Sequence, residues 1–363
     1  MPTFFIVLLC LYLIGNIYIF RRARQALVAQ STGVKVLLGV LYWMCAVSFF
    51  SSFLFRNVDL PDSYAHTVHE IGTGWLVFTL YMVLLLGAFD LLRLIHIRSK
   101  NSFFVSTGLT LCLLGVGYYV YQHPDTKVIN IVINRPLVAY QPVLKVIAVS
   151  DLHLGYGTDK ARLQHYVRMI NEQNPDLILI GGDLIDNSLV PLRSERMDEE
   201  LSKLKAPMGV YMVPGNHEYI SGMDDCANFL ATTPIRLLRD SVVTLPGGLQ
   251  LIGRDDRHNA HRLPLAALVA QTDGTKPILL MDHQPYDLAE TEAMGIDLQF
   301  SGHTHHGQVW PVSLVTDYLF EQSYGYRQWG KSHIYVSSGL SLWGPPFRIG
   351  TNSELVVFNL SFK

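Results

Sequence analysis

The sequence has no excess of charge of either sign, and it has few cysteines. Its 28 basic and 30 acidic residues give a formal net charge of −2. This balance argues against nucleic acid as a partner. The sequence also has no acidic tail of the kind that forms a disordered binding arm. Only four cysteines occur, three of them inside apolar runs. We therefore predict no structural disulfide.

Charge is also scarce in the first third of the chain, where four long apolar runs occur. Only thirteen charged residues lie in the first 126 positions, and the runs cover residues 3–20, 34–55, 75–97 and 103–121. Each run is near the ~20 residues that a helix needs to cross a bilayer core. We therefore predict a transmembrane domain of four helices in residues 1–124. No basic segment precedes the first run, so we interpret it as a retained helix rather than a signal peptide.

The basic residues of the short links predict the orientation of this domain. Lys and Arg favour the cytoplasmic side of a membrane. The first link carries Arg21, Arg22, Arg24 and Lys35, and the third carries Arg98 and Lys100. The second link balances Arg56 with Asp59, Asp62 and Glu70. We therefore expect a multi-pass protein of a bacterial inner (cytoplasmic) membrane, with both termini and the C-terminal domain on the extracytoplasmic side.

One carboxylate, Asp90, lies inside the third apolar run. A charge within a membrane helix is costly and often functional. The alternative, which we favour, is an ion pair with Arg93 one helical turn later, close to the headgroups.

Residues 125–363 have a different sequence pattern, in which short Val- and Ile-rich runs alternate with amphipathic stretches. We predict strands at residues 128–133, 145–150, 177–180, 209–213, 249–252, 277–281, 298–300, 333–337 and 354–359. We predict helices at residues 160–172, 197–204, 223–230, 264–270 and 289–294. This order indicates an α/β domain with two mixed sheets between helical layers.

Five motifs place metal-binding side chains where a predicted strand runs into a loop. They are Asp151-Leu152-His153, Gly181-Gly182-Asp183, Gly215-Asn216-His217-Glu218, His283-Gln284-Pro285 and Gly302-His303-Thr304-His305. Any one of them occurs by chance, but five in order indicate a metal site. The two glycines before Asp183 let the backbone approach a crowded site closely.

These residue types suit the hydrolysis of phosphoesters. Two divalent ions about 3.5–4 Å apart activate a water molecule and neutralise the phosphate. Mixed Asp, Asn and His ligands favour Mn²⁺, Fe²⁺ or Zn²⁺ over Ca²⁺, which prefers oxygen ligands. We expect Mn²⁺. One carboxylate has to bridge the ions, and a histidine has to remain free to protonate the leaving group.

The order and spacing of the five motifs resemble the calcineurin-like metallophosphoesterase superfamily, from about Lys145 to the C-terminus. Within it the sequence looks most like the membrane-associated bacterial phosphoesterases of the YkuE/YaeI type. The resemblance implies a four-layer α/β/β/α sandwich. It implies one metal ion held by Asp151, His153, Asp183 and His305, and a second held by Asp183, Asn216, His283 and His303. His217 would contact the phosphate and act as general acid, and Asp183 would bridge the ions.

Two further residues are weaker candidates for contacts with the substrate. His306 stands where relatives often have glycine, and it is either a substrate contact or, as we favour, a tolerated loop residue. Arg348 belongs to the segment Gly344-Pro345-Pro346-Phe347-Arg348. Its guanidinium suits a second phosphate or an anionic headgroup, although it is equally an ordinary surface arginine.

An apolar, aromatic stretch at residues 310–329 follows the last metal motif. It is either a flap that docks on the bilayer or holds a lipid chain, or a segment that packs on the sandwich. With the membrane helices, it favours a phospholipid or lipid-linked phosphate as the substrate. The alternatives are a soluble phosphodiester or phosphomonoester, with the helices as an anchor only, and a non-catalytic metal-binding scaffold. The oligomeric state does not follow from the sequence.

Overall fold

The computed structural model describes residues 2–54, 62–137 and 143–363 and divides into two compact units. The helical unit comprises Met1–Val120 with Gly344–Ile349, and the sandwich unit comprises Tyr121–Trp343 with Gly350–Lys363. The short segment Gly344–Ile349 thus groups with the apolar helices, which the sequence did not predict. Three residues of the predictions lie outside the described residues: Phe55, at the end of the second predicted helix, and Arg56 and Asp59 of the second link.

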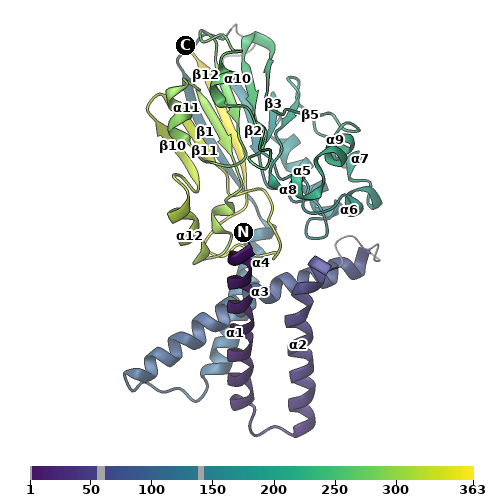
Figure 1. Cartoon of the computed structure of the whole chain (residues 1–363), viewed down its shortest axis with the longest axis vertical. Coiled ribbons are helices and arrows are strands. Elements are labelled where there is room, and N and C mark those ends of the chain that lie inside the picture. The colour runs from purple at the N-terminus through teal and green to yellow at the C-terminus, as the bar shows by residue number, and fades with distance from the viewer. Residues whose placement is uncertain (1, 55–61, 138–142) are drawn as a thin grey trace. The chain divides into compact units, whose positions relative to one another are not determined.

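The helical unit contains four long helices, each apolar and long enough to cross a membrane. They are α1 (Pro2–Ala26), α2 (Thr32–Leu54), α3 (Asp62–Leu94) and α4 (Ser102–Gln122) (Figure 1).

Two of these helices are longer than their apolar runs. Helix α1 continues through the basic residues Arg21, Arg22 and Arg24, and α3 begins at Asp62 rather than at residue 75. Hydropathy marks only the part of a helix that suits lipid, whereas backbone hydrogen bonding continues into polar sequence. The 33 residues of α3 span about 50 Å, so this helix is longer than a bilayer core of about 30 Å is thick.

A buried asparagine holds three of the helices together. Asn16 of α1 is fully buried. Its side-chain oxygen lies 2.9 Å from both the Tyr42 hydroxyl of α2 and the Trp75 indole nitrogen of α3, and both groups donate to it. Its amide nitrogen donates to the Tyr12 carbonyl at 2.9 Å. Hydrogen bonds of this kind between apolar helices satisfy groups that lipid cannot.

Asp90 belongs to a second polar cluster of the helical unit. Its carboxylate accepts hydrogen bonds from the Tyr18 hydroxyl at 2.5 Å and from Arg22, and it pairs with Arg93 at 2.9 Å. Arg22 is buried and also donates to Ser102 of α4 at 3.0 Å. The predicted pair with Arg93 is confirmed. The sequence did not predict the contact with Arg22, because it assigned that residue to a link.

The sandwich unit contains two six-stranded mixed sheets. The first has the order β1-β12-β2-β3-β4-β5 and the second the order β10-β11-β9-β8-β7-β6. The strands of the first sheet are β1 (Asp125–Ile133), β2 (Leu144–Val149), β3 (Leu177–Ile180), β4 (Val210–Met212), β5 (Ile235–Leu237) and β12 (Glu354–Phe362). Those of the second are β6 (Ser241–Thr244), β7 (Gln250–Gly253), β8 (Ile278–Met281), β9 (Leu298–Ser301), β10 (Gly325–Trp329) and β11 (Ser332–Val336).

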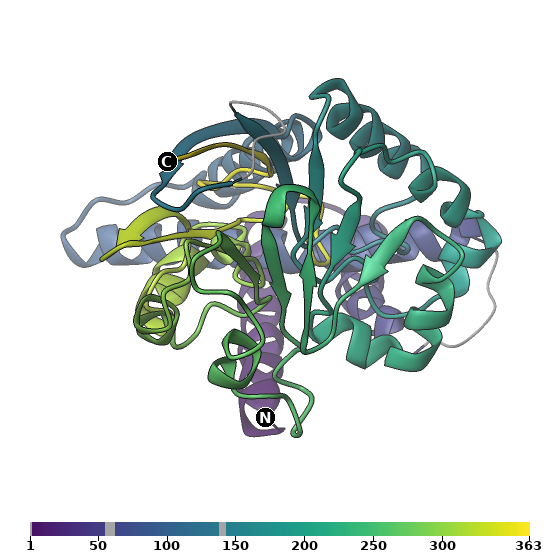
Figure 2. The same cartoon turned by 90° about the horizontal axis from the view of Figure 1, so that it is seen from above.

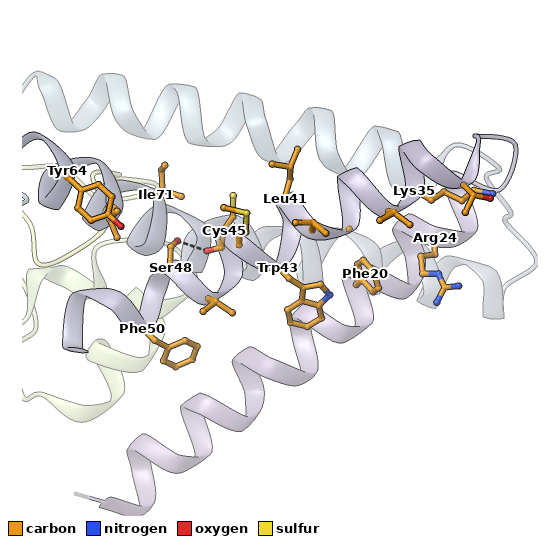
Figure 3. Close-up of a pocket in the computed structure, with 17 residues that line it drawn as sticks. Phe20, Arg24, Lys35, Leu41, Trp43, Cys45, Ser48, Phe50, Tyr64 and Ile71 are labelled. Atoms are coloured by element: carbon orange, nitrogen blue, oxygen red, sulfur yellow. Dashed lines mark hydrogen bonds between the residues drawn. The ribbon is translucent and has the colours of Figure 1, made fainter. Parts of the chain in front are cut away.

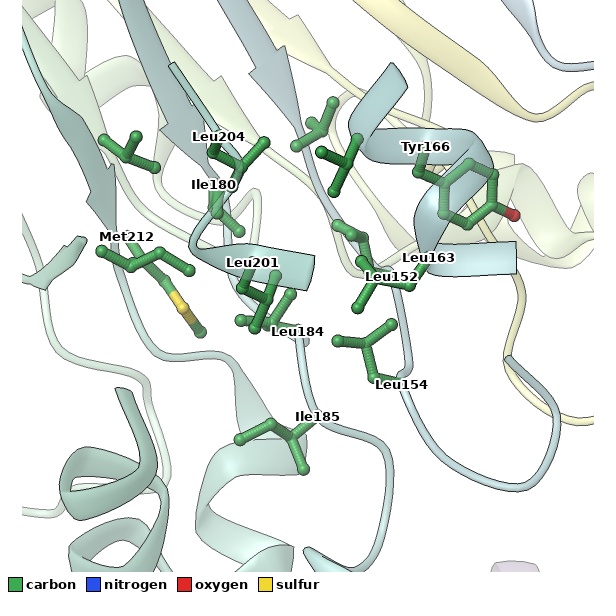
Figure 4. Close-up of a cluster of buried hydrophobic side chains, with 14 of the residues drawn as sticks. Leu152, Leu154, Leu163, Tyr166, Ile180, Leu184, Ile185, Leu201, Leu204 and Met212 are labelled. Carbon is green, nitrogen blue, oxygen red and sulfur yellow. The ribbon is translucent and has the colours of Figure 1, made fainter. Parts of the chain in front are cut away.

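The side chains of the central strands alternate between two cores. In β2, Val146 and Ala148 pack against the second sheet, whereas Ile147 and Val149 pack against helices. Both faces are apolar because both are covered, as is usual for parallel strands with helices outside. The cluster in Figure 4 lies on the helix-facing side and includes Ile180 of β3 and Met212 of β4.

Helices cover the outer faces of both sheets, which gives the predicted α/β/β/α layers (Figure 2). On the first sheet they are α5 (Lys160–Glu172), α6 (Val190–Ser194), α7 (Met197–Leu201), α8 (Asn216–Ser221) and α9 (Met223–Leu230). On the second they are α10 (Leu265–Val269) and α11 (Leu288–Ala293). The stretch at residues 310–329, to which the sequence assigned no helix or strand, forms α12 (Val312–Leu319) and β10.

If the Asp90 cluster is structural, its loss should lower the stability of the helical unit. We expect Asp90→Asn and Arg22→Gln each to lower the melting temperature in detergent, because each leaves a partner without its ion pair. The double variant should lose less free energy of unfolding than the two single variants lose together. The difference is the coupling energy of the pair, about 0.6–1.7 kcal/mol. Arg93→Gln, at a more exposed pair, is the milder control. Additive losses would show that Arg22 and Asp90 do not stabilise each other.

Candidate metal centre

The predicted metal ligands follow five strands whose carboxyl ends meet at one edge of the sandwich. Strands β2, β3 and β4 are parallel neighbours in the first sheet, and β7, β8 and β9 are parallel neighbours in the second. Loops after parallel strands gather at one edge, where ligands of such sheets bind. The ligands are Asp151 and His153 after β2, Asp183 after β3, Asn216 after β4, His283 after β8, and His303 and His305 after β9.

Five of these seven residues have a left-handed backbone, which is rare for residues with a side chain. The φ angles are 54° at Asp151, 45° at His153, 50° at Asp183, 73° at His303 and 48° at His305. Such conformations cost about 1–3 kcal/mol each and concentrate at functional sites. The strained loops turn each side chain sharply out of its strand and into the cluster.

The first group of ligands is formed by Asp151, His153 and His305. The Nε2 atoms of His153 and His305 face each other at 3.1 Å. Asp151 Oδ1 lies 3.9 Å from Nε2 of His153 and 3.5 Å from that of His305. Two imidazole nitrogens and a carboxylate oxygen directed at one point form a typical ligand set for a divalent ion.

The second group is formed by Asp183, His283 and His303, with Asn216 beside them. The side-chain oxygen of Asn216 lies 2.8 Å from His303 Nδ1 and 3.3 Å from His283 Nε2. The other ring nitrogen of His283 lies 2.7 Å from the Gly181 carbonyl. A hydrogen bond of this kind fixes the tautomer of a histidine ligand.

Asp183 connects the two groups. Its Oδ2 atom lies 3.8 Å from His153 Nε2 and 3.1 Å from His283 Nε2. One carboxylate is therefore in reach of both groups, as a bridging ligand has to be. Its Oδ1 atom accepts the backbone N–H of His217 at 2.8 Å, which fixes the orientation of the carboxylate.

Glycine is required at two positions where the loops approach one another. A Cβ atom on Gly182, whose φ is +94°, would lie 2.5 Å from His283 Nδ1. A Cβ atom on Gly302 would lie 2.3 Å from Asp151 Oδ2. Real Cβ atoms do not approach so closely, so larger residues at either position would displace a predicted ligand. The predicted role of the Gly181-Gly182 pair in close backbone approach is thus confirmed at Gly182.

The electrostatics of the site fit a cation. Burial raises the pKa of Asp151, because it opposes the charged form. Burial acts on Asp183 in the same direction, but the nearby charge of His283 outweighs it and holds the pKa well below its usual range. Burial lowers the pKa of His303 to about 4, which keeps this imidazole neutral and able to bind a metal. Buried carboxylates in such a cluster require a positive partner.

Asp186 is a candidate functional residue that sequence reasoning missed. Its Oδ1 atom lies 3.3 Å from Nδ1 of both His153 and His217, and its carbonyl oxygen lies 2.7 Å from His217 Nδ1. Burial favours a lower pKa for His217, but the hydrogen bond to Asp186 and the charges of Asp183 and Asp186 raise it to about 9. Asp186 thus orients a predicted ligand and the predicted general acid together. Its position three residues after Asp183 was the available signal.

Glu218 is a second residue whose role the sequence did not predict, although it belongs to a quoted motif. It is fully buried. Its carboxylate accepts the backbone N–H groups of Gly215 at 2.7 Å, Ile185 at 2.9 Å and Asp183 at 3.0 Å. It therefore joins the loop after β3 to the start of α8. Burial and the neighbouring charge of Asp183 raise its pKa to about 7.

The weaker candidates for substrate contacts are distributed differently. His306 is in none of the ligand groups of the described residues; its ring stacks on Tyr324 at 4.6 Å, and its Nε2 lies 3.8 Å from Asp317. Arg348 belongs to the helical unit and is buried, so the alternative of an ordinary surface arginine is wrong; its backbone N–H donates to the Gly117 carbonyl at 2.9 Å. The structure does not group Arg348 with the ligands, so its contact with phosphate stays a prediction.

Trp343, which sequence reasoning did not single out, lies at the rim of the site. Its ring centroid is 6.1 Å from that of His217, and 45% of the residue is exposed. An exposed indole beside the predicted general acid offers an apolar surface to a substrate.

Comparisons with known proteins point to one family. Residues 144–307 match the family model for calcineurin-like phosphoesterases. An uncharacterized metallophosphoesterase of Helicobacter pylori strain J99 is 34% identical, with 71% of this chain and 70% of the relative covered. A transmembrane protein with a metallophosphoesterase domain from Danio rerio is 27% identical over 95% of this chain and 86% of its own. The metallophosphoesterase YkuE of Bacillus subtilis is 29% identical over 60% and 78%.

The arrangement predicts how metal content responds to substitution. We expect about two divalent ions per chain in the wild-type protein and fewer than one in Asp183→Ala, because both groups lose the shared carboxylate. Asn216→Ala should lose mainly one ion. Elemental analysis by mass spectrometry after desalting measures this. His306→Gly is the control: its backbone φ of 49° suits glycine, and its metal content should not change. A loss of metal there would identify His306 as a ligand.

Proposed function

The chain belongs to the calcineurin-like phosphoesterase family, and from this we propose that it hydrolyses a phosphate or pyrophosphate ester of a membrane lipid or lipid-linked intermediate. Membership makes it a metal-dependent phosphoesterase, and its four apolar helices match a relative that is itself named a transmembrane protein. The lipid substrate, Mn²⁺ as the preferred ion and the extracytoplasmic side are our proposals.

The residues of the two groups would hold the ions, with Asp183 shared between them. Bound divalent ions would supply an activated water molecule and neutralise the phosphate. The chain contributes the positions of the ligands, which the strained loops and Glu218 fix before any substrate arrives. Preorganisation of this kind is a large part of catalytic power.

His217 is placed to protonate the leaving oxygen. Its Nδ1 atom contacts the Asp186 carbonyl at 2.7 Å, which leaves Nε2 as the atom available to a substrate. The ring packs edge-on against that of His153 at 4.6 Å, so this nitrogen lies beside the first ligand group. The Asp186 carboxylate favours the protonated imidazole, which is the form that a general acid needs.

The position of α12 beside the ligands carries the proposal of a lipid substrate. The loop with His303 and His305 runs directly into this helix, and a Cβ atom on Gly307 would lie 2.4 Å from the Ser313 nitrogen. Phe320, at the end of α12, packs against the His303 ring at 6.0 Å. The helix is thus fixed against the metal site.

The outer face of α12 is apolar and exposed. The exposed fractions are 58% at Leu314, 53% at Val315, 87% at Tyr318 and 61% at Leu319, and that of Trp310 just before the helix is 51%. Contiguous exposed apolar groups in a soluble domain usually mark a binding surface. An aromatic and aliphatic helix of this kind suits the boundary between headgroups and acyl chains. Beside the ligands, it supports a substrate whose phosphate is joined to a hydrocarbon chain.

The orientation of the protein rests on the short links. Arg21, Arg24 and Lys35 cluster at the connection of α1 and α2, and Arg98 and Lys100 lie between α3 and α4. With four spans, both connections lie on the face opposite to the sandwich unit. We propose that this face is cytoplasmic, which puts the sandwich unit on the extracytoplasmic side of a bacterial inner membrane.

Turnover tests the proposed reaction directly. We expect the purified protein in detergent with Mn²⁺ to hydrolyse a phosphate ester in a total membrane-lipid extract. The rate should exceed that on an aryl phosphomonoester or an aryl phosphodiester. Asp183→Ala should abolish hydrolysis of all three. Preference for a soluble ester would favour the soluble alternative, and bound metal with no turnover would favour the scaffold.

Substitutions on α12 test whether this helix contributes to recognition of a lipid substrate rather than to the hydrolysis step. We expect Leu314→Ser with Tyr318→Ser to lower hydrolysis of the lipid about tenfold, while hydrolysis of a soluble aryl ester changes less than twofold. The apolar face would be lost, whereas the ligands would stay in place. Val128→Ser on β1, an exposed apolar residue on an edge strand of the first sheet, is the control. Equal losses on both substrates would remove the argument from α12.

A map of membrane sidedness tests the orientation. We expect a reporter enzyme that is active only outside the cytoplasm to be active when fused after Lys363 and inactive when inserted at Gln30, between α1 and α2. The reverse pattern would place the metal centre in the cytoplasm and contradict the proposed side.

A further inference from the structure

The helical unit contains a long apolar groove of about 1300 Å³ along α2 (Figure 3). Its walls include Val40, Met44 and Val47 of α2 and Ile71 of α3. The two ends differ in character. Arg24 and Lys35 lie at one end, and Phe50 and Tyr64 lie at the other. Helix α2 has the smallest buried share among the four spans, 6% against 17–28%. Much of its surface is therefore available to a hydrophobic ligand.

A second cavity of about 440 Å³ begins at the same two cations. It also shares Phe20, Gly39, Leu41 and Cys45 with the first groove. From this common end it runs toward Trp75 of α3 and toward Phe103 and Phe104 at the start of α4. The helical unit thus offers two apolar branches that meet at one cationic end.

The cationic end is suited to an anion. Neither cavity is lined by an acidic residue of the described chain. The Lys35 ammonium donates to the Val28 carbonyl at 2.7 Å, which uses one of its three N–H groups. Arg24 is exposed beside it, at the end of α1. A guanidinium and an ammonium at the edge of an apolar surface match a phosphate headgroup.

We propose that this site binds an anionic phospholipid with two acyl chains. Its phosphate contacts Arg24 and Lys35, and one chain lies in each branch. Gly39 lines both branches, and a Cβ atom there would lie 3.5 Å from the Phe20 ring, which also lines both. Basic pockets between membrane helices on the cytoplasmic side bind anionic headgroups in this way.

The site is distinct from the proposed substrate site. Three spans, α2, α3 and α4, separate its cationic end from the sandwich unit along the chain. All residues that line the two cavities belong to the helical unit, whereas the predicted metal ligands belong to the sandwich unit. The lipid therefore acts as a bound structural ligand that fills the space along α2, and the enzyme does not hydrolyse it.

Lipid binding to the full-length protein tests this inference. The probe is dioleoyl phosphatidylglycerol at one part in ten of phosphatidylcholine in nanodiscs, with retained lipid counted by native mass spectrometry. We expect one phosphatidylglycerol per chain. Arg24→Gln with Lys35→Gln should weaken its retention about tenfold, because two charged contacts to the phosphate are lost. Arg21→Gln with Lys100→Gln is the control: it removes two cations, one from the first link and one from the third, that line neither cavity, and it should change retention less than twofold.

Two more variants distinguish binding at this site from diffuse electrostatic attraction of the lipid and from binding at the metal centre. Gly39→Leu should weaken retention without a change of charge, because the new side chain fills the junction. Asp183→Ala should retain the lipid fully, so a failure of the proposed hydrolysis would leave this result intact. Equal losses in the two double variants would indicate a diffuse surface charge. Loss in Asp183→Ala would place the lipid at the metal centre. Unchanged retention after removal of Arg24 and Lys35 would also overturn the inference.

Discussion

The burial of negative charge at one edge of the sandwich is the constraint on which the catalytic unit depends. Asp151, Asp183, Asp186 and Glu218 all lie within a cluster that water hardly reaches. Carboxylates in such a place have to be paired, hydrogen-bonded or bound to cations. The four are accommodated in three ways: Asp151 and Asp183 belong to ligand groups, Asp186 lies beside two imidazoles, and Glu218 accepts three backbone N–H groups. Divalent ions would complete the neutralisation that the imidazoles begin.

The loops that carry these charges depend in turn on the rigid sheets beneath them. Left-handed backbone at five ligands is unfavourable in isolation, and buried strands on either side hold the ends of each loop in place. The helical unit meets the same problem in an apolar environment. Asn16 and Asp90 are surrounded there by donors from neighbouring helices, so its polar groups hold the helices in register. In both units, polar groups that would be costly alone determine the arrangement of the elements around them.

The sequence predicted elements best where periodicity and composition agree. Residues 160–172, 177–180 and 223–230 match α5, β3 and α9 residue for residue, and the order of the five motifs predicted which side chains would meet. Prediction from the sequence failed for elements whose conformation depends on contacts with neighbouring elements. The short edge strands β5, β6 and β10 have weak patterns of their own, and α12 is only eight residues long, within a mainly aromatic and aliphatic run. Asp186 was missed because its role depends on two histidines that are distant in sequence.

The position of β12 has a consequence for how the protein is made. This strand pairs with β1 on one side and with β2 on the other, so residues 354–362 fill the gap between the first two strands of the sandwich unit. The first sheet cannot close until the ribosome has added them, more than two hundred residues after β1. Until then β1 has no partner strand in the sheet, and β2 pairs on one side only, with β3. Late addition of one central strand thus delays completion of the first sheet to the end of synthesis.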